Sequence, residues 1–383
     1  MTYFSLLIVI TTYYYVLAGR GIITMRYIPT FCLREGMILG KSLYGLNNEL
    51  MLRDGIKLTS TYISTIKKLQ YNGLYVIDEL SENIEIVNVI DETLRAEAVK
   101  GVKRIFMDTR SGDIKALSNQ IEATKKIVDD ILDNILNNKD AMINIIDLKM
   151  FDDYTYYHST NVAILSLLIG ITLNLNKKQL YELCLGALMH DIGKVFISTS
   201  IINKPAKLTS EEYNTIKTHP SLGVDYMNKL FSIPTSAINC ILDHHEKFDG
   251  SGYPMQKIGD KISLYGRIVA VADVYDALIS DRPYRKGLPP SEAIEFIMGG
   301  SGSQFDINIV KIFITRVAPY PLGTCLKLSN GCLAIVVENH QECCLRPTVK
   351  VFNDGKNKVT PYVIKLMEDS HYINVTILEI INM

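Results

Sequence analysis

The chain has 383 residues, of which 48% are hydrophobic and 21% are charged, and its formal net charge is -1 at pH 7. This composition supports folded cores and excludes extensive disorder. The balanced charge excludes a global basic field for binding DNA. The length predicts two or three domains, and seven irregularly spaced cysteines are typical of a reduced cytoplasmic protein.

The beginning of the chain contains an apolar run, residues 3–18. The run is shorter than the roughly 20 residues that a membrane span needs, and it lacks the positively charged start of a signal peptide. Two interpretations remain open. The run is a real membrane anchor, or residues 1–24 are a wrongly assigned leader and translation begins at Met25, where the chain resembles an ordinary protein start. We expect a cytoplasmic protein without membrane association unless the run is real.

Residues 25–90 predict a small α/β domain. Its short apolar runs are separated by turns that contain glycine, and they lie at residues 37–39, 50–52, 74–77 and 84–89. Thr59 can cap a helix that buries Ile63 and Ile66. The region contains no catalytic set of residues, so its expected role is sensing, partner contact or structural support.

Residues 91–144 predict a helical connector. Mostly apolar side chains recur there in steps of three and four residues, at Ile114, Leu117, Ile121, Thr124, Val128, Ile131 and Ile135. Such a seam contacts a partner helix. The partner can belong to the same domain, or the helix over residues 114–135 can form a homodimer, and the pattern favours neither alternative.

The pattern of residues 145–316 predicts a series of consecutive helices. Five of the seven histidines lie between residues 158 and 245. We expect helices over 155–170, over 178–190, from Thr209 or Ser210 to 219–220, over 236–246 and over 264–281. These helices carry His158, His190-Asp191, His219, His244-His245 and Asp273. Gly193 follows the second helix and suits a helix C-terminus with a left-handed backbone.

Residues 317–383 change character. They are rich in β-branched residues, and Gly323, Gly331 and Gly355 mark expected turns. We therefore predict a small β-rich appendage. The whole chain is predicted to be mainly α, with a small α/β domain and a helical connector before the helical domain and the β appendage after it.

The adjacent imidazole and carboxylate of His190 and Asp191 lie at the end of an apolar helix, where burying two polar groups is unfavourable. The pair makes chemical sense if both groups bind one metal ion, or if the carboxylate bridges two. Histidine and carboxylate ligands together suit manganese, iron or zinc, and a shared carboxylate suits a two-metal centre.

A set of motifs runs through the helical region. It comprises His158-Ser-Thr-Asn-Val-Ala, His190-Asp-Ile-Gly-Lys194, His219-Pro220, His244-His245-Glu246, Asp249-Gly-Ser-Gly252-Tyr253-Pro254, Ala272-Asp273-Val-Tyr-Asp276-Ala-Leu and Asp281-Arg282-Pro283-Tyr284-Arg285. In order and spacing this set resembles the HD-GYP family, a branch of the HD phosphohydrolase superfamily. The resemblance implies an HD-type helical bundle that forms the catalytic domain over residues 145–316.

The resemblance also implies a set of metal ligands. One metal ion would be held by His158, His190, Asp191 and Asp273. A second would be held by His219, His244 and His245, with Asp191 bridging. The family commonly uses iron or manganese. We expect two divalent ions rather than three, because some members place a glutamate for a third metal where this chain has Tyr154.

The implied activity is hydrolysis of cyclic di-GMP to pGpG and, with continued turnover, to GMP, by a hydroxide that bridges the two metals. Asp191 and Lys194 are the implied catalytic residues, and Lys194, Arg282 and Arg285 are the implied phosphate contacts. Arg282 can instead pair with a neighbouring carboxylate. Tyr253 can stack on guanine, contact a partner protein or brace its loop. A diguanylate cyclase is a further candidate partner.

Two alternatives to this activity remain. The chain could hydrolyse another cyclic dinucleotide or a nucleotide, or it could be a non-hydrolytic cyclic di-GMP receptor or scaffold. Degenerate members usually lose metal ligands, whereas all seven expected ligand positions are occupied here. This favours catalysis.

Overall fold

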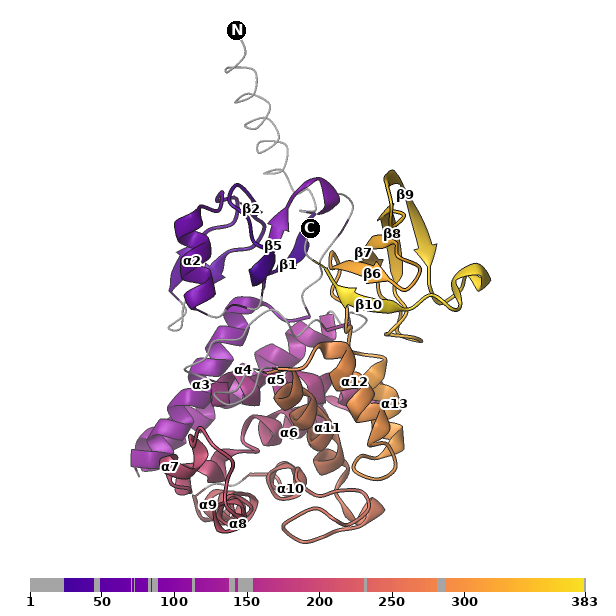
Figure 1. Ribbon diagram of the computed structural model, residues 1–383. Helices are drawn as coiled ribbons and strands as arrows, with labels where there is room; N and C mark the ends of the chain where they lie inside the picture. The colour runs from indigo at the N-terminus through magenta and orange to yellow at the C-terminus, as the bar shows by residue number, and fades with distance from the viewer. Residues whose placement is uncertain are drawn as a thin grey trace. The chain divides into compact units, whose positions relative to one another are not determined.

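The structure is a computed structural model. It describes residues 24–44, 49–69, 71, 73–81, 84, 89–111, 114–137, 142–143, 154–230, 233–280 and 287–381. Its internal contacts divide the chain into two compact units (Figure 1). Met1–Val87, Pro321–Asn339 and Arg346–Met383 form the first, and Asn88–Tyr320 and His340–Leu345 form the second. The apolar run at residues 3–18 lies outside the described residues.

The N-terminal part of the first unit is the predicted small α/β fold. Its antiparallel sheet has the strand order β1-β5-β2, formed by Arg26–Pro29, Gly73–Ile77 and Ile38–Leu39. A second pair of strands joins β3 (Leu43–Tyr44) to β4 (Leu50–Leu52). Helix α2 (Ser60–Lys68) begins as predicted, because the Thr59 side chain accepts a hydrogen bond from the Tyr62 backbone N–H, and it buries Ile63 and Ile66.

The C-terminal part of the first unit is the predicted β appendage. Its antiparallel sheet has the order β10-β6-β7-β8-β9, formed by Ile377–Ile380, Cys325–Leu328, Leu333–Glu338, Thr348–Asn353 and Lys358–Lys365. Gly323, Gly331 and Gly355 have φ values of 82°, 89° and 93°, which confirms their positions at tight turns. Ile84 packs in a small apolar cluster with Phe352, so the two parts of the unit share buried surface.

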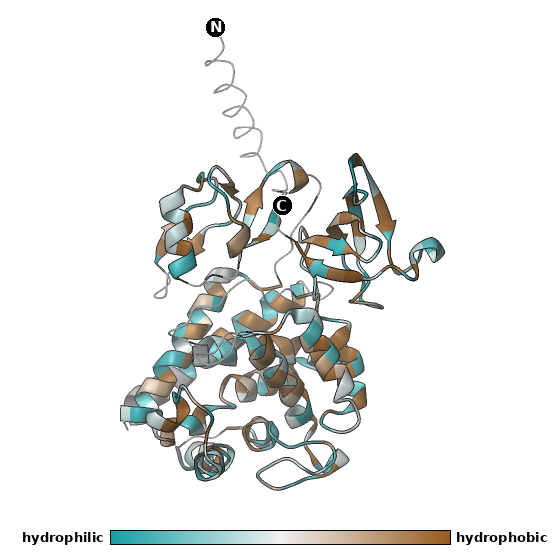
Figure 2. Cartoon of the chain, in the orientation of Figure 1, coloured by the Kyte–Doolittle hydropathy of each residue, from teal (hydrophilic) through white to brown (hydrophobic). Residues whose placement is uncertain are grey.

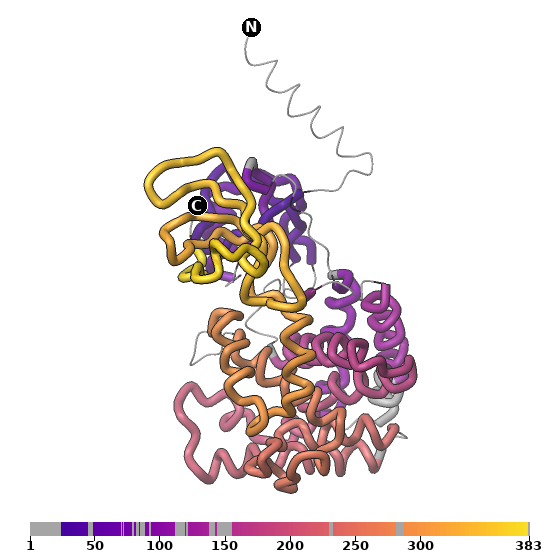
Figure 3. Tube along the Cα trace, turned by 90° about the vertical axis from the view of Figure 1, so that its right-hand side faces the viewer, coloured from indigo at the N-terminus to yellow at the C-terminus, as the bar shows by residue number. Residues whose placement is uncertain are grey.

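The second unit is the helical bundle. Its helices are α3 (Glu92–Ser111), α4 (Ile114–Asn137), α5 (Tyr154–Thr172), α6 (Lys177–Leu188), α7 (Thr199–Ile202), α8 (Ser210–Ile216), α9 (His219–Leu230), α10 (Thr235–Asp243), α11 (Leu264–Ile279), α12 (Pro290–Gly299) and α13 (Ile307–Ile314). They enclose one hydrophobic core, and Figure 2 shows helices with apolar and polar sides. Helices α12 and α13, orange in Figure 3, pack beside α11. None of the described helices combines the length and apolar composition needed to cross a bilayer.

Helix α4 carries the predicted seam. The side chains of Thr124, Val128, Ile131 and Ile135 are buried, and the last three belong to the core of their own unit. This half of the seam therefore packs within its own domain, which was one of the two predicted alternatives. The side chains at 114, 117 and 121 lie outside the described part of the chain, so a homodimer through residues 114–135 stays a prediction.

Candidate metal centre

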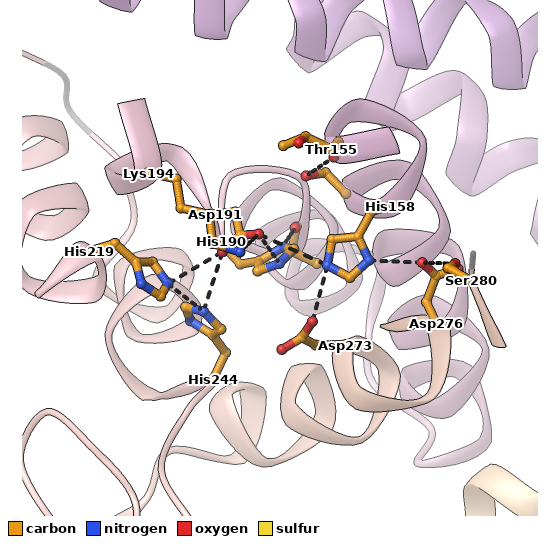
Figure 4. A network of polar contacts seen from close by, with 12 residues as sticks. Thr155, His158, His190, Asp191, Lys194, His219, His244, Asp273, Asp276 and Ser280 are labelled. Carbon is orange, nitrogen blue, oxygen red and sulfur yellow. Dashed lines mark hydrogen bonds and ion pairs between the residues drawn. The ribbon is translucent and has the colours of Figure 1, made fainter. Parts of the chain in front are cut away.

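Helices of the second unit bring their histidines and aspartates together (Figure 4). The seven side chains expected from the sequence are His158 on α5, His190 and Asp191 just after α6, His219 at the start of α9, His244 and His245 just after α10, and Asp273 on α11. Helix α6 packs against α5 and α10, and α10 packs against α9 and α11. Side chains from helices that are distant in sequence therefore converge on one place.

The turn after α6 differs from the prediction. The helix ends at Leu188 rather than at residue 190, because the chain tightens into the 3₁₀ helix η4 (Ile192–Phe196). Gly193 does not have the predicted left-handed backbone. It is needed for a different reason, since a Cβ atom there would overlap the carbonyl oxygen of His219. This close approach of η4 to α9 holds Asp191 Oδ1 3.3 Å from His219 Nε2.

The position of His219 also differs from the prediction. The helix expected to end at His219-Pro220 stops at Ile216, and His219 is the first residue of the next helix, α9. Proline is accepted in the first turn of a helix, where its missing N–H needs no partner. Pro220 therefore belongs to a helix start here. A boundary shift of the same kind ends α10 at Asp243 rather than at residue 246.

Three imidazoles are anchored in the same way. The Nδ1 atoms of His190, His219 and His244 lie 2.7, 2.8 and 2.9 Å from the backbone carbonyl oxygen three residues earlier. A carbonyl oxygen only accepts hydrogen bonds, so each Nδ1 carries the proton and donates it. Each Nε2 then presents a lone pair to the centre, which is how protein histidines are prepared for a metal ion.

His158 is anchored by a carboxylate instead. Its Nδ1 lies 2.8 Å from Asp276 Oδ2, and its Nε2 lies 3.0 Å from Asp273 Oδ1. The role of Asp276 was not predicted, although its position three residues after Asp273 places both on one face of α11. A neutral imidazole cannot donate to both carboxylates at once. A cation at Nε2 satisfies both contacts, and the carboxylate–histidine pair is a common support for a bound metal.

The donor atoms inside the centre point at one another. Nε2 of His219 and Nε2 of His244 are 3.2 Å apart, although both carry lone pairs. His190 Nε2 and Asp191 Oδ1 are buried without a hydrogen-bond partner among the described residues. Leaving a buried polar atom unsatisfied costs about 1–3 kcal/mol. A divalent cation between these atoms removes the repulsion and the unsatisfied atoms together, so the residues fit a metal ion.

The charge states of the side chains suit the same chemistry. Burial, with the neighbouring His245, lowers the pKa of His244 well below its usual range. Burial lowers the pKa of His245 from 6.5 to about 3. Burial opposes the ionisation of both Asp191 and Asp273. The pKa of Asp191 is nevertheless held below 3.8 by Lys194 and the surrounding imidazoles. The pKa of Asp273 is held below 3.8 by its hydrogen bond with His158. At neutral pH His244 and His245 are therefore neutral, and the carboxylates of Asp191 and Asp273 are ionised.

The ligand atoms fall into two groups that could each hold a metal ion. One group is His158, His190 and Asp273, and the other is Asp191, His219, His244 and His245. Asp191 lies between the groups, because its Oδ1 faces His219 while its Oδ2 lies 3.4 Å from His190 Nε2. The prediction also counted Asp191 among the ligands of the first ion, whereas here it falls in the second group, so its bridging role stays a prediction.

Tyr253 packs against the exposed edge of the centre. Its ring stacks on the His245 ring, with the centroids 4.8 Å apart and the planes inclined by 29°. Its backbone N–H donates to the His245 carbonyl oxygen at 3.1 Å. The Glu246 carboxylate accepts hydrogen bonds from the backbone N–H groups of Met255 and Lys257 at 2.6 and 3.0 Å. These contacts favour the interpretation of Tyr253 as a brace for its loop and for His245.

Lys194 lies at the edge of the centre. Its Nζ donates to Asp191 Oδ2 at 2.5 Å, and its side chain is 31% exposed. Arg282, Arg285 and the side chain of Tyr154 lie outside the described residues. Their expected roles, two phosphate contacts and the lack of a ligand for a third metal, therefore stay predictions.

Known proteins are similar to this part of the chain. A family model described as "HD domain" matches residues 137–309. A cyclic di-GMP phosphodiesterase of Pseudomonas aeruginosa is 36% identical over 266 residues, which is 70% of this chain and 63% of that protein. A cyclic di-GMP phosphodiesterase of Thermotoga maritima is 31% identical over 58% of this chain and 62% of that protein. A 3'3'-cGAMP-specific phosphodiesterase of Vibrio cholerae is 39% identical over 40% of this chain and 33% of that protein.

The helical unit and its histidine–aspartate centre define an HD domain. The Gly252-Tyr253-Pro254 motif and these relatives make the chain similar to the HD-GYP branch of HD proteins, and membership of that branch stays a prediction. The matched regions span less than two thirds of the length of each of these three relatives.

Proposed function

We propose that this protein is a metal-dependent phosphodiesterase that hydrolyses cyclic di-GMP. The observation that carries the proposal is the 3.2 Å approach of the His219 and His244 Nε2 atoms, with Asp191 Oδ1 3.3 Å from the first of them. Three donor atoms that would repel one another in a dry site become ligands when a cation joins them. Imidazole and carboxylate donors in this combination suit manganese, iron or zinc.

The centre would hold two divalent ions, with iron or manganese as the expected metals. His158, His190 and Asp273 would hold one ion, and His219, His244 and His245 would hold the other, with Asp191 bridging. Two ions at such a centre supply positive charge for the phosphoryl oxygens and lower the pKa of a bound water to a value useful at neutral pH.

The side chains of the chain itself have separate tasks. The anchored Nδ1–H groups of the imidazoles keep Nε2 directed inward, and Tyr253 limits the movement of His245, whose side chain is 24% exposed. Lys194 is the described cation nearest to the bridging carboxylate and is exposed enough to exchange its contact with Asp191 for one with a phosphate oxygen. Asp191 would then remain ionised and would stay in contact with both groups of ligands.

The choice of substrate follows the relatives. Cyclic di-GMP is named for the P. aeruginosa relative, which matches 70% of this chain, and the expected products are pGpG and, with continued turnover, GMP. The V. cholerae relative specific for 3'3'-cGAMP matches 40% of this chain. We therefore keep 3'3'-cGAMP as the second candidate substrate.

The test combines metal analysis with hydrolysis. The purified full chain, loaded with Mn²⁺ or Fe²⁺ without oxygen, is incubated with cyclic di-GMP and, separately, with 3'3'-cGAMP. We expect two metal ions per chain and faster loss of cyclic di-GMP. Asp191→Ala is expected to lose the ion held by His219, His244 and His245 and to lose turnover.

A matched control is Asp225→Ala. This aspartate lies on the exposed side of α9, so its removal should leave metal content and turnover unchanged. Binding of cyclic di-GMP without hydrolysis by the metal-loaded chain would replace the enzyme with a receptor. Faster hydrolysis of 3'3'-cGAMP would replace the substrate, and failure to bind metal would refute the centre itself.

A further inference from the structure

A chain of buried hydrogen bonds leads from helix α3 to the metal centre. Arg95 lies near the start of α3, and its NH2 group donates to Asn161 Oδ1 at 2.9 Å. Asn161 Nδ2 donates to Asp276 Oδ1 at 2.9 Å, and Asp276 Oδ2 accepts from His158 Nδ1 at 2.8 Å. Figure 4 shows the last of these contacts. The four side chains are between 0% and 6% exposed.

Donor and acceptor chemistry permits only one orientation of the groups in this series of hydrogen bonds. A guanidinium group only donates, so the atom of Asn161 that faces Arg95 must be the amide oxygen. The amide nitrogen must then face Asp276, whose carboxylate accepts. One oxygen of Asp276 is thus occupied by Asn161, and the other is available for His158. Arg95 therefore determines the orientation of Asn161, and through it the side of the carboxylate that anchors the imidazole.

A buried guanidinium is costly to remove from water, and hydrogen bonds are what make its burial acceptable. An apolar side chain would fill the space between α3 and α5 at a lower desolvation cost. Arg95 is far from any role in substrate contact, since Asn161 and Asp276 separate it from His158. The hydrogen bond from this buried guanidinium to Asn161 is the first link of the series that leads to the metal ligand.

We propose that Arg95 is a positioning residue for His158 and that it ties helix α3 to the affinity of the centre for metal. The inference rests on the proposed metal centre. Helix α3 is the first described helix of the second unit, and α3 packs against α5. A shift of the start of α3 relative to α5 separates Arg95 from Asn161. This loosens Asp276 and lets the His158 ring rotate away from the other ligands.

The test measures metal affinity rather than activity alone. Mn²⁺ is titrated by calorimetry into the chelator-treated full chain, and far-ultraviolet circular dichroism verifies that each variant is folded. Loss of a carboxylate that orients a ligating histidine typically costs about 10- to 100-fold in affinity, and this range is expected for Asp276→Asn. Arg95→Met acts one step further away and is expected to lose about tenfold, within the span of indirect couplings.

The two ions provide an internal comparison. The weakened binding step should be the one assigned to His158, His190 and Asp273, while the other step changes less. Arg95→Met and Asn161→Leu interrupt the same chain, so the double variant should lose little more than either single variant. With saturating metal, kcat should recover towards the wild-type value, because Arg95 does not contact the substrate.

Arg104→Met is the matched control, since Arg104 lies on the exposed side of the same helix. It should bind Mn²⁺ like the wild type. If Arg95→Met does not fold, Arg95→Lys keeps a charged donor and should lose less affinity than Asp276→Asn. Wild-type affinity in a folded Arg95 variant, alongside weakened Asp276→Asn, would overturn this inference alone. Absence of Mn²⁺ binding by the wild type would overturn the metal centre instead.

Discussion

Acidification of the metal-free protein from pH 7 to pH 5 is expected to destabilise the helical unit. Burial lowers the folded-state pKa values of His244 and His245 below the usual 6.5. The pKa of His245 is lowered to about 3. The unfolded chain binds protons at these imidazoles below pH 6.5, whereas the folded chain does not. The free energy of unfolding is therefore at its full value above pH 6.5 and falls as the pH decreases towards the folded-state pKa values.

The size of the effect follows from this difference. A pH of 5 lies 1.5 units below the unfolded-state pKa of an imidazole, which is about 6.5. This difference corresponds to about 2 kcal/mol of lost stability for each imidazole that stays neutral in the folded chain. His245 alone therefore predicts a loss of about 2 kcal/mol, and His244, whose pKa is also lowered, adds to the loss in the same direction. The carboxylates of Asp191 and Asp273 add nothing in this range, because their unfolded-state pKa of 3.8 lies below it.

Urea unfolding followed by circular dichroism at 222 nm measures this loss. The signal reports the helices, and the chain contains no tryptophan for a fluorescence assay. With a slope of about 2–3 kcal/mol per molar urea, the loss from His245 alone should lower the midpoint by about 0.7–1 M between pH 7 and pH 5, and His244 should lower it further. His245→Asn should remove the part of the shift that His245 contributes, about 0.7–1 M, and the exposed His371→Asn should remove none. A midpoint that stays constant or rises on acidification would refute the buried, neutral state of these imidazoles.

Two further predictions concern the backbone and the loop beside the centre. Gly193→Ala is expected to destabilise the helical unit by about 3 kcal/mol through overpacking, because its Cβ would overlap a backbone carbonyl of α9. Gly299→Ala is the control, since a Cβ there meets nothing within 4 Å. Equal urea midpoints for the two variants would contradict the reasoning. Tyr253→Ala is expected to weaken Mn²⁺ binding by releasing His245, whereas Tyr253→Phe keeps the stacked ring and should bind like the wild type; equal loss in both would assign the effect to the hydroxyl group instead.

Local patterns were sufficient to predict much of this molecule. The alternation of apolar residues in steps of three and four indicated the helices, because each helix must bury one face. Thr59 and Thr209 indicated helix starts, since their hydroxyl groups accept the backbone N–H groups that a first turn leaves without partners, and both cap their helices in the structure. The three turn glycines were also readable, because residue type determines which backbone angles are available, whereas the seven candidate ligands came from the resemblance of the motifs to a known family.

Other features depend on contacts between residues far apart in the chain. The inward direction of His158 Nε2 is determined by Asp276, 118 residues later, and the orientation of Asn161 by Arg95, 66 residues earlier. The approach of η4 to α9 explains Gly193 and places His219 beside Asp191, although the sequence had suggested a left-handed helix end.

The sequence by itself determined which segments would be helical, because that property resides in the spacing of apolar residues, and its motifs indicated candidate metal ligands through their resemblance to a known family. The tertiary structure alone decided which nitrogen of each described imidazole is anchored, that Val128, Ile131 and Ile135 of α4 pack into the core of their own unit, and which helix supports His158. These outcomes depend on the packing of helices from different parts of the chain, and hydrogen bonds across such contacts have no local signature in the sequence.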